Sequence, residues 1–222
     1  AEEELGELPS FKVSFKTLAL EKGDYEGIFI QSQTNDSPIP VNFGRYNRSD
    51  PYVYEGPADI VFFKLKPTED PEQPYNKVPV AFFKITDKTP DEDLLLLFRP
   101  LREEGTAGEK FTIYGMDDSQ KAFPVDTVIF VNTTSLDFLG LVNGEKADFP
   151  KGPSKPFTLT STFKTSIVFD SNQKFHYMFE NSFNFQKNSR VLMVLHPPKR
   201  RGSLRIQCRF ITETFPASQG ED

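Results

Sequence analysis

The two histidines of the chain, His176 and His196, are the first candidates for acid–base or metal chemistry. They lie in separate stretches with no HExxH motif and no cysteine partner, so a zinc site would have to recruit distant carboxylates. His196 ends an apolar run, and a polar residue is ordinary at the end of a strand. The sequence contains no GxSxG elbow, P-loop or GxGxxG motif. We therefore expect no catalytic residue, no metal and no cofactor.

A hydrolase is the alternative, because the members of a Ser–His–Asp triad need not be close in sequence. Its cryptic site would lie between two domains and use His176 or His196. The carboxylate pair Asp117–Asp118 favours a turn before an interdomain linker, since neighbours on a strand point to opposite faces. The single cysteine, Cys208, sits in the strand-like run LRIQCRF, which favours a buried structural thiol.

The stretch GRYNRSDPYVYEGP at 44–57 is the strongest candidate for binding, because it combines tyrosine and arginine with turn formers. Interfaces favour these two residue types, which offer contact area together with directed hydrogen bonds, and aromatic faces also stack on sugars. Its counterpart at 144–153 is shorter and holds one aromatic residue. We hypothesise a binding loop specific to the first domain; the alternative is a strand whose tyrosines pack at a sheet edge. The predicted binding residues are Arg45, Tyr46, Arg48, Tyr52 and Tyr54.

Three Asn-x-Ser/Thr sequons occur, at Asn35, Asn47 and Asn132. Two of them lie near matching turns of an internal repeat, described below. Asn and Ser/Thr side chains stabilise turns by bonding to the nearby backbone, and we expect this geometry rather than glycosylation to explain them.

The composition indicates a folded protein built of short strands. The 222 residues are 37% hydrophobic and 26% charged, with 23 Phe and no Trp, and 18 Pro and 13 Gly break the chain every few residues. The net charge of −6 argues against nucleic-acid binding, which needs clustered basic residues. No apolar run approaches the ~20 residues that span a bilayer, so we expect a peripheral association with a membrane at most.

The positioning elements are expected to be strands, many of them rich in Val, Ile, Phe and Leu. The phrases DLLLLFRP (93–100) and RVLMVLHP (190–197) are continuously apolar, which predicts central strands covered on both faces. A helix over 90–104 is the alternative for the first phrase, and the β interpretation is preferred because the second phrase fits a helix badly. Residues 11–20 look like an extra strand before the repeat, and 67–79 form a Pro-rich loop without a similar counterpart.

The two apolar phrases belong to a longer internal repeat. Residues 28–44 align with 128–144, and FTIYG at 111 corresponds to LRIQC at 204. Phe123-Pro124 then matches Phe215-Pro216, so the order is kept along the chain. We predict an all-β protein of two tandem immunoglobulin-like β-sandwich domains from an internal duplication, at residues 10–124 and 125–216.

The sequence contains, in order, a strand ending in FVNTT, a short turn, an apolar pair, NG, GP and an apolar strand capped by HPP. This pattern resembles a group of uncharacterised exported bacterial proteins with tandem β-sandwich repeats. It is also similar to the two-domain β-sandwich periplasmic accessory proteins of alginate acetylation. The resemblance covers both copies and implies an envelope or extracellular setting and a non-enzymatic role. The opening AEEELGELPS fits a mature chain left after signal peptidase, or a trimmed chain, and we expect a secreted or periplasmic protein.

The leading hypothesis is therefore an exported structural or binding module that interacts with an envelope protein or polysaccharide. Besides the hydrolase, a third possibility is an assembly subunit that oligomerises through its edge strands. The oligomeric state does not follow from the sequence.

Overall fold

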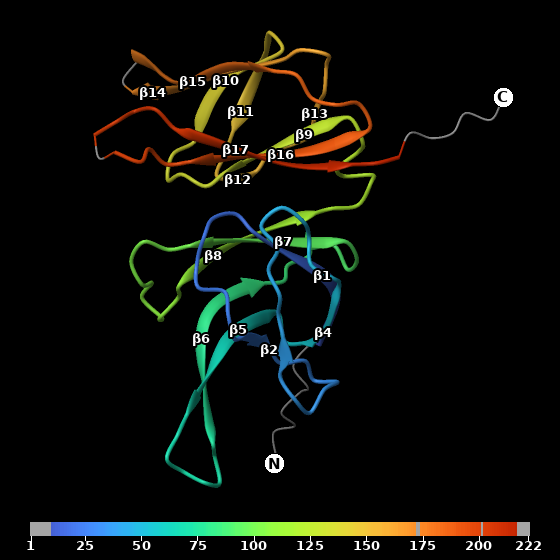
Figure 1. Ribbon diagram of the computed structural model, residues 1–222, viewed down its shortest axis with the longest axis vertical. Helices are drawn as coiled ribbons and strands as arrows, with labels where there is room; N and C mark the ends of the chain where they lie inside the picture. Colours follow the sequence, from blue (N-terminus) through green and yellow to red (C-terminus); the bar gives the residue numbers. More distant parts are fainter. Residues whose placement is uncertain (1–9, 172–173, 201, 217–222) are drawn as a thin grey trace, which may run out of the picture. The chain divides into compact units, whose positions relative to one another are not determined.

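The computed structural model describes residues 10–171, 174–200 and 202–216 (Figure 1). Residues 1–9, from the segment that motivates the expectation of export, lie outside this part. Across the described residues the chain is all-β, with seventeen strands in four sheets, and no helix is long and apolar enough to cross a membrane. The sheets pair into sandwich-like arrangements, and the chain divides into two compact units, Ala1–Asp118 and Ser119–Asp222.

The first unit contains two four-stranded sheets, with strand orders β4-β1-β7-β8 and β3-β2-β5-β6. Apolar side chains from both sheets form one core between them; Phe15 and Phe98 come from the first sheet, and Ile28 and Phe62 from the second. The strands are β1 (Phe11–Ala19), β2 (Ile28–Ile30), β3 (Ile39–Pro40), β4 (Tyr52–Gly56), β5 (Asp59–Pro67), β6 (Tyr75–Lys84), β7 (Leu94–Pro100) and β8 (Phe111–Asp117).

The second unit pairs a sheet of order β12-β9-β16-β17, in which β13 also pairs with β9, with a sheet of order β11-β10-β14-β15. Its core again takes aromatic residues from both sheets, such as Phe130 and Phe163. The strands are β9 (Thr127–Asn132), β10 (Phe138–Val142), β11 (Glu145–Phe149), β12 (Gly152–Pro153), β13 (Phe157–Thr158), β14 (Phe163–Ser171), β15 (Lys174–Phe183), β16 (Ser189–His196) and β17 (Gln207–Thr214).

The two units share one topology, and this corrects part of the expected alignment. β1 runs parallel to β7, with Phe15 opposite Leu94, while β9 runs parallel to β16, with Val128 opposite Val191. β9 is therefore the counterpart of β1, and the expected match of 28–44 to 128–144, which sets β9 against β2, is wrong. The strand expected at 11–20 is present as β1, but it is an inner strand of its sheet and so belongs to the repeat rather than preceding it.

Matching β-bulges support the same correspondence. The β5–β6 ladder shifts register between Phe62 and Phe63, and the β14–β15 ladder between Ile167 and Val168. The extra residues on the opposite strands, Val80 and Met178, are buried. Each turns its carbonyl towards the other sheet of its unit: the Val80 oxygen accepts from the Lys110 amide at 2.7 Å, and the Met178 oxygen from the Ile206 amide at 3.2 Å.

The two apolar phrases form central strands, as predicted. Leu94–Phe98 of β7 is entirely buried, and so are residues 189–195 of β16. The helix considered for 90–104 is wrong, since β7 occupies its centre. The Pro-rich loop expected at 67–79 is shorter than predicted, because residues 75–79 belong to β6. Residues 68–74 join β5 to β6 in a hairpin that extends beyond its sheet (Figure 1), whereas only 172–173 separate β14 from β15.

Candidate binding surfaces

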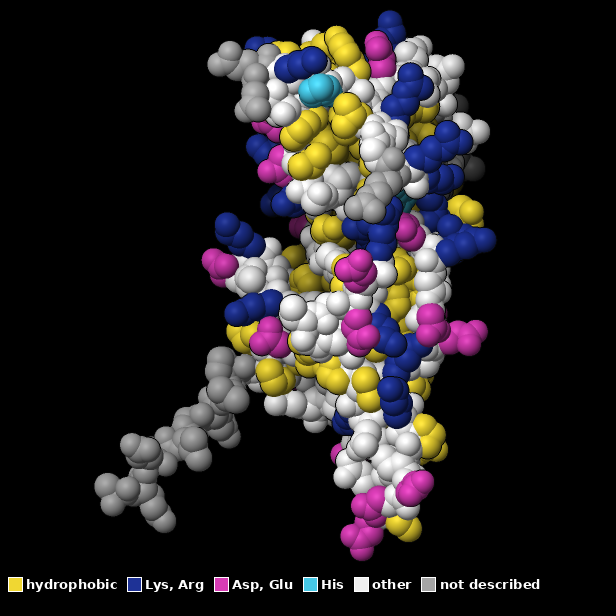
Figure 2. All heavy atoms as spheres, turned by 90° about the vertical axis from the view of Figure 1, so that its left-hand side faces the viewer, with side chains coloured by type: hydrophobic (Ala, Val, Ile, Leu, Met, Phe, Trp, Pro, Cys, Tyr) yellow, Lys and Arg dark blue, Asp and Glu magenta, His cyan; other side chains and the backbone are white. Residues whose placement is uncertain are grey.

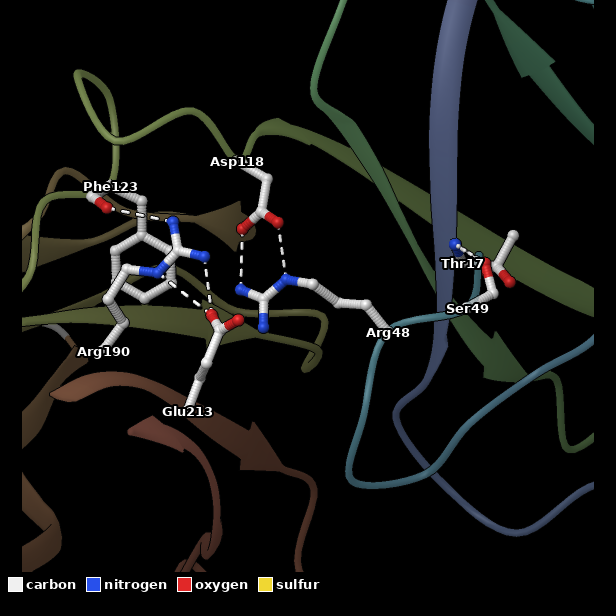
Figure 3. Close-up of polar contacts among 7 residues, drawn as sticks. All are labelled: Thr17, Arg48, Ser49, Asp118, Phe123, Arg190 and Glu213. Carbon is white, nitrogen blue, oxygen red and sulfur yellow. Dashed lines mark hydrogen bonds and ion pairs between the residues drawn. The ribbon is translucent and has the colours of Figure 1, made fainter. Parts of the chain in front are cut away.

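The loop of residues 44–50, between β3 and β4, carries three of the predicted binding residues and is fixed to β1 (Figure 3). The Ser49 amide donates to the Thr17 carbonyl oxygen at 3.0 Å, and the Thr17 amide donates to Ser49 Oγ at 2.9 Å. A Cβ atom at Gly44 would lie 2.0 Å from the Asn47 carbonyl oxygen, so only glycine fits this close turn. The loop is thus held by its hydrogen bonds to β1 and by its own close turn.

Arg48 anchors the same loop to the end of β8. Its Nε donates to Asp118 Oδ2 at 2.5 Å and its Nη2 donates to Asp118 Oδ1 at 2.7 Å (Figure 3). The Asp118 side chain is 3% exposed and the Arg48 side chain 11%. Arg48 therefore holds the loop in place through a nearly buried, bidentate ion pair. Asp118, expected only as part of a turn, is the partner that sequence reasoning missed, because it lies 70 residues away.

Tyr46 is the member of the predicted set that the loop presents outward. Its side chain is 64% exposed, and the Arg45 guanidinium carbon lies 5.7 Å from its ring centroid. An arginine over a tyrosine face restrains both side chains and leaves a flat apolar surface beside a positive charge.

The other two tyrosines support the sheet. The Tyr52 hydroxyl accepts a hydrogen bond from the Asn42 amide at 2.8 Å. Tyr54 is buried, its hydroxyl donates to the Pro57 carbonyl oxygen at 2.9 Å, and burial raises its pKa above the ordinary 10.0. The structure therefore brings Arg45, Tyr46 and Arg48 together on one loop, and it sets Tyr52 and Tyr54 on the adjoining strand as packing residues.

A second buried arginine, Arg190 of β16, organises the second unit (Figure 3). Its Nη2 and Nε donate to Glu213 Oε2 at 2.6 and 3.1 Å, and its Nη1 donates to the Phe123 carbonyl oxygen at 3.2 Å. The guanidinium lies over the Phe123 and Phe215 rings, 5.0 and 5.1 Å from their centroids. Phe123-Pro124 and Phe215-Pro216 are matched in the sequence as the ends of the two copies. The phenylalanines of both motifs therefore contact Arg190.

The histidines lie on strands of different sheets: His176 in β15 and His196 at the end of β16. In the described ranges, no group of three or more His, Cys, Asp or Glu side chains could hold a metal ion. Burial raises the pKa of the Cys208 thiol, which packs against the core and stays protonated at neutral pH. The hydrolase alternative stays a prediction.

The sequon at Asn132 has the turn geometry expected of it. Asn132 Oδ1 accepts from the Thr134 amide at 3.0 Å and from the Thr134 hydroxyl at 2.8 Å. Its Nδ2 donates to the carbonyl oxygens of Leu136 and Phe149 at 2.8 and 2.9 Å. The side chain is fully buried, so it closes the turn after β9.

A second surface, which the sequence analysis did not identify, is the outward side of the sheet β11-β10-β14-β15. We call it the open face. Leu139 and Leu141 of β10 are each 44% exposed, while Phe138 and Val142 at the ends of the strand are buried. Phe175 and Tyr177 of β15 are 59% and 70% exposed, so four of the ten exposed large hydrophobic residues among those described lie here. Figure 2 shows hydrophobic side chains of the second unit reaching the surface among lysines and acidic residues.

In the first unit, the matching row is covered by residues of its own sheet. The row beside the bulge there is Phe29–Phe63–Pro79, and in the second unit it is Leu139–Val168–Tyr177. Phe63 stacks on Phe29 with centroids 6.3 Å apart, and the Lys77 ammonium lies 5.2 Å from the Phe63 centroid. Phe63 is thereby left only 3% exposed.

Two depressions border the open face. One, of about 230 Å³, is lined by Leu141, Lys164, Ser166 and Glu180 among others. A larger one, of about 400 Å³, lies between β15 and the segment before β17, and Tyr177, Glu180 and Arg205 line it. Hydroxyl and charged groups thus surround exposed aromatic and aliphatic side chains, an arrangement suited to binding.

The comparisons with known proteins add no relative to this picture. A scan of the sequence against protein-family models finds no match, and a search of curated proteins finds none either.

Proposed function

We propose that this chain is an exported, non-enzymatic binding module made of two tandem immunoglobulin-like domains, and that the open face is its main binding surface. The partner is an envelope protein or polysaccharide. The observation that carries the proposal is the gathering of Leu139, Leu141, Phe175 and Tyr177 on one exposed sheet face. An exposed apolar patch with a polar rim marks an interaction site on a soluble domain.

Three further features support the proposal. The shared topology and the matching bulges agree with an internal duplication. The polar networks at Arg48 and Arg190 each hold loops and strands of their own unit in place. The resemblance to exported tandem β-sandwich proteins agrees with an envelope setting.

The loop of residues 44–50 is the second candidate surface within the same function. Tyr46 offers one exposed ring with Arg45 beside it, on a backbone that its anchors make rigid. A rigid loop loses little conformational entropy on binding, which favours recognition.

Co-sedimentation with insoluble polysaccharides, peptidoglycan and a washed envelope fraction tests the proposal. Tyr177→Ala removes the most exposed ring of the open face, and Tyr46→Ala removes the exposed ring of the loop. We expect Tyr177→Ala to reduce the bound fraction at least about fivefold, as loss of a central aromatic contact does. Binding that neither substitution changes, or no binding to any of these materials, would contradict the assignment.

A further inference from the structure

The open face has a charge pattern that matches itself. Lys146 and Asp148 are exposed neighbours on the outward side of β11, separated by the buried Ala147. Leu141 lies opposite Lys146, and Leu139 lies opposite Asp148. Each of these two adjacent rows therefore begins with a charge and continues with an exposed leucine, and the two charges have opposite signs.

β14 repeats the same pattern over a longer span. Its outward residues run Lys164, Ser166, Val168, Asp170, so a lysine and an aspartate stand at opposite ends of the strand on one face. None of Lys146, Asp148, Lys164 and Asp170 forms an ion pair with another part of the described chain. These charges are available to a partner.

We propose that the open face binds a second copy of this chain, face to face. The twofold axis lies in the plane of the interface, perpendicular to the strands and between the two central rows. This inference rests on the proposed binding role of that face and adds a second copy of the chain as a partner. The axis exchanges the two central rows, so that Leu139 meets Leu141 of the second copy and Lys146 meets its Asp148. The same rotation brings Lys164 to Asp170 of the second copy.

Each of these contacts occurs twice because the interface is isologous. On β15 the exchange sets the Tyr177 hydroxyl against Glu180 of the second copy, a phenol donor against a carboxylate acceptor. Apolar contact at the centre with opposite charges around it is the usual anatomy of an interface. In the first unit, Phe29 and Lys77 already cover the matching row.

The size of the face indicates how strong the association is. Four strands at about 4.8 Å and four rows at about 6.7 Å give a footprint of roughly 500 Å² on each copy. The total of roughly 1,000 Å² is below the ~1,200 Å² of stable complexes, so the dimer is weak and reversible. Sedimentation velocity should therefore cover about 10 μM to about 1 mM purified chain, with no ligand added.

Charge reversal tests both the face and the axis. Lys146→Asp and Asp148→Lys each set like charges together twice, and we expect each to weaken the dimer at least about tenfold. The double variant Lys146→Asp/Asp148→Lys restores opposite charges across the axis and should return association to within about threefold of the parent. Val53→Lys, at an exposed position of β4 in the first unit, is the matched control and should change nothing. All three positions are exposed, and thermal melts verify folding.

Three results overturn the inference: a chain that stays monomeric over the whole range, single variants that associate like the parent, or a double variant that does not recover. A monomer that still binds envelope material through Tyr177 would reject the second copy as the partner and leave the binding function standing. If the charge-reversal variants lose self-association but bind polysaccharide as the parent does, the dimer is supported and polysaccharide binding does not depend on it.

Discussion

Removing the charge of Asp118 should release the 44–50 loop and destabilise the first unit. In Asp118→Asn the Arg48 guanidinium keeps a neighbour of the same shape, but it loses the charge that balances it. Breaking a buried ion pair by removing one partner costs about 3–5 kcal/mol. Because Arg48 is 11% exposed and can draw on water, we expect the lower end, about 3 kcal/mol.

Tyrosine fluorescence during urea unfolding is the appropriate assay. Six of the seven tyrosines lie in the first unit and only Tyr177 in the second, so the signal reports on the unit that contains the pair. Arg48→Met, Asp118→Leu and the double variant Arg48→Met/Asp118→Leu form a double-mutant cycle that isolates the coupling between the two side chains. The expected coupling is about 2 kcal/mol or more, because two apolar side chains of similar size leave no uncompensated charge.

The Lys64–Asp24 pair of the same unit is the matched control. Its distance is 2.8 Å, but the Asp24 side chain is 79% exposed, so Asp24→Asn should cost at most about 0.5 kcal/mol. If Asp118→Asn cost as little as Asp24→Asn, or if the cycle showed no coupling, the conclusion that this ion pair fixes the loop would be refuted.

Four more outcomes are expected. Asn132→Ala removes four hydrogen bonds from a buried turn and should destabilise the second unit by about 3 kcal/mol, measured by urea unfolding, whereas Asn35→Ala, at an exposed sequon, should be nearly neutral. Gly140→Ala places a Cβ 2.0 Å from the Ser166 carbonyl oxygen, and its thermal melt should show a loss of at least about 2 kcal/mol. Burial raises the pKa of Tyr54 above 10.0, so the folded chain keeps a proton that the unfolded chain releases; stability should be complete below pH 10 and fall as the pH rises beyond it, and Tyr54→Phe should reduce that fall in urea titrations at high pH. Because burial raises the pKa of Cys208, alkylation by iodoacetamide at pH 8 should be at least about tenfold slower in the folded chain than in urea, and equal rates would show that the thiol is exposed.

The strands that the sequence predicted best are those buried on both faces. β7 and β16 are continuously apolar, so their central position follows from composition alone. β1 is harder to place, because lysines alternate with its apolar residues, while its counterpart β9 is nearly continuous. Matching by apolar content therefore set β9 against the short apolar strand β2, and only the parallel pairing with β7 and β16 reveals the true partner.

The binding surfaces were predictable to a smaller extent, for two physical reasons. Arg48 has the residue type of an interface, but its role depends on Asp118, which lies far away in the sequence. The open face was hidden because FLGLV carries apolar residues on both sides of the strand, and an outward leucine cannot be distinguished by type from an inward one. A local sign was present in the alternation of Lys146 and Asp148 with Ala147, which marks a strand with one face in water.

The bulged residues Val80 and Met178 give each unit a built-in probe of whether its two sheets are together. The amides of Lys110 and Ile206 donate across the gap between the sheets rather than along a ladder, so local fraying of one sheet does not explain their protection. Their hydrogen–deuterium exchange rates should follow separation of the sheets, while amides within β7 and β16 follow global unfolding. Comparing the two sets within one experiment gives the free energy for opening the sandwich in each unit separately.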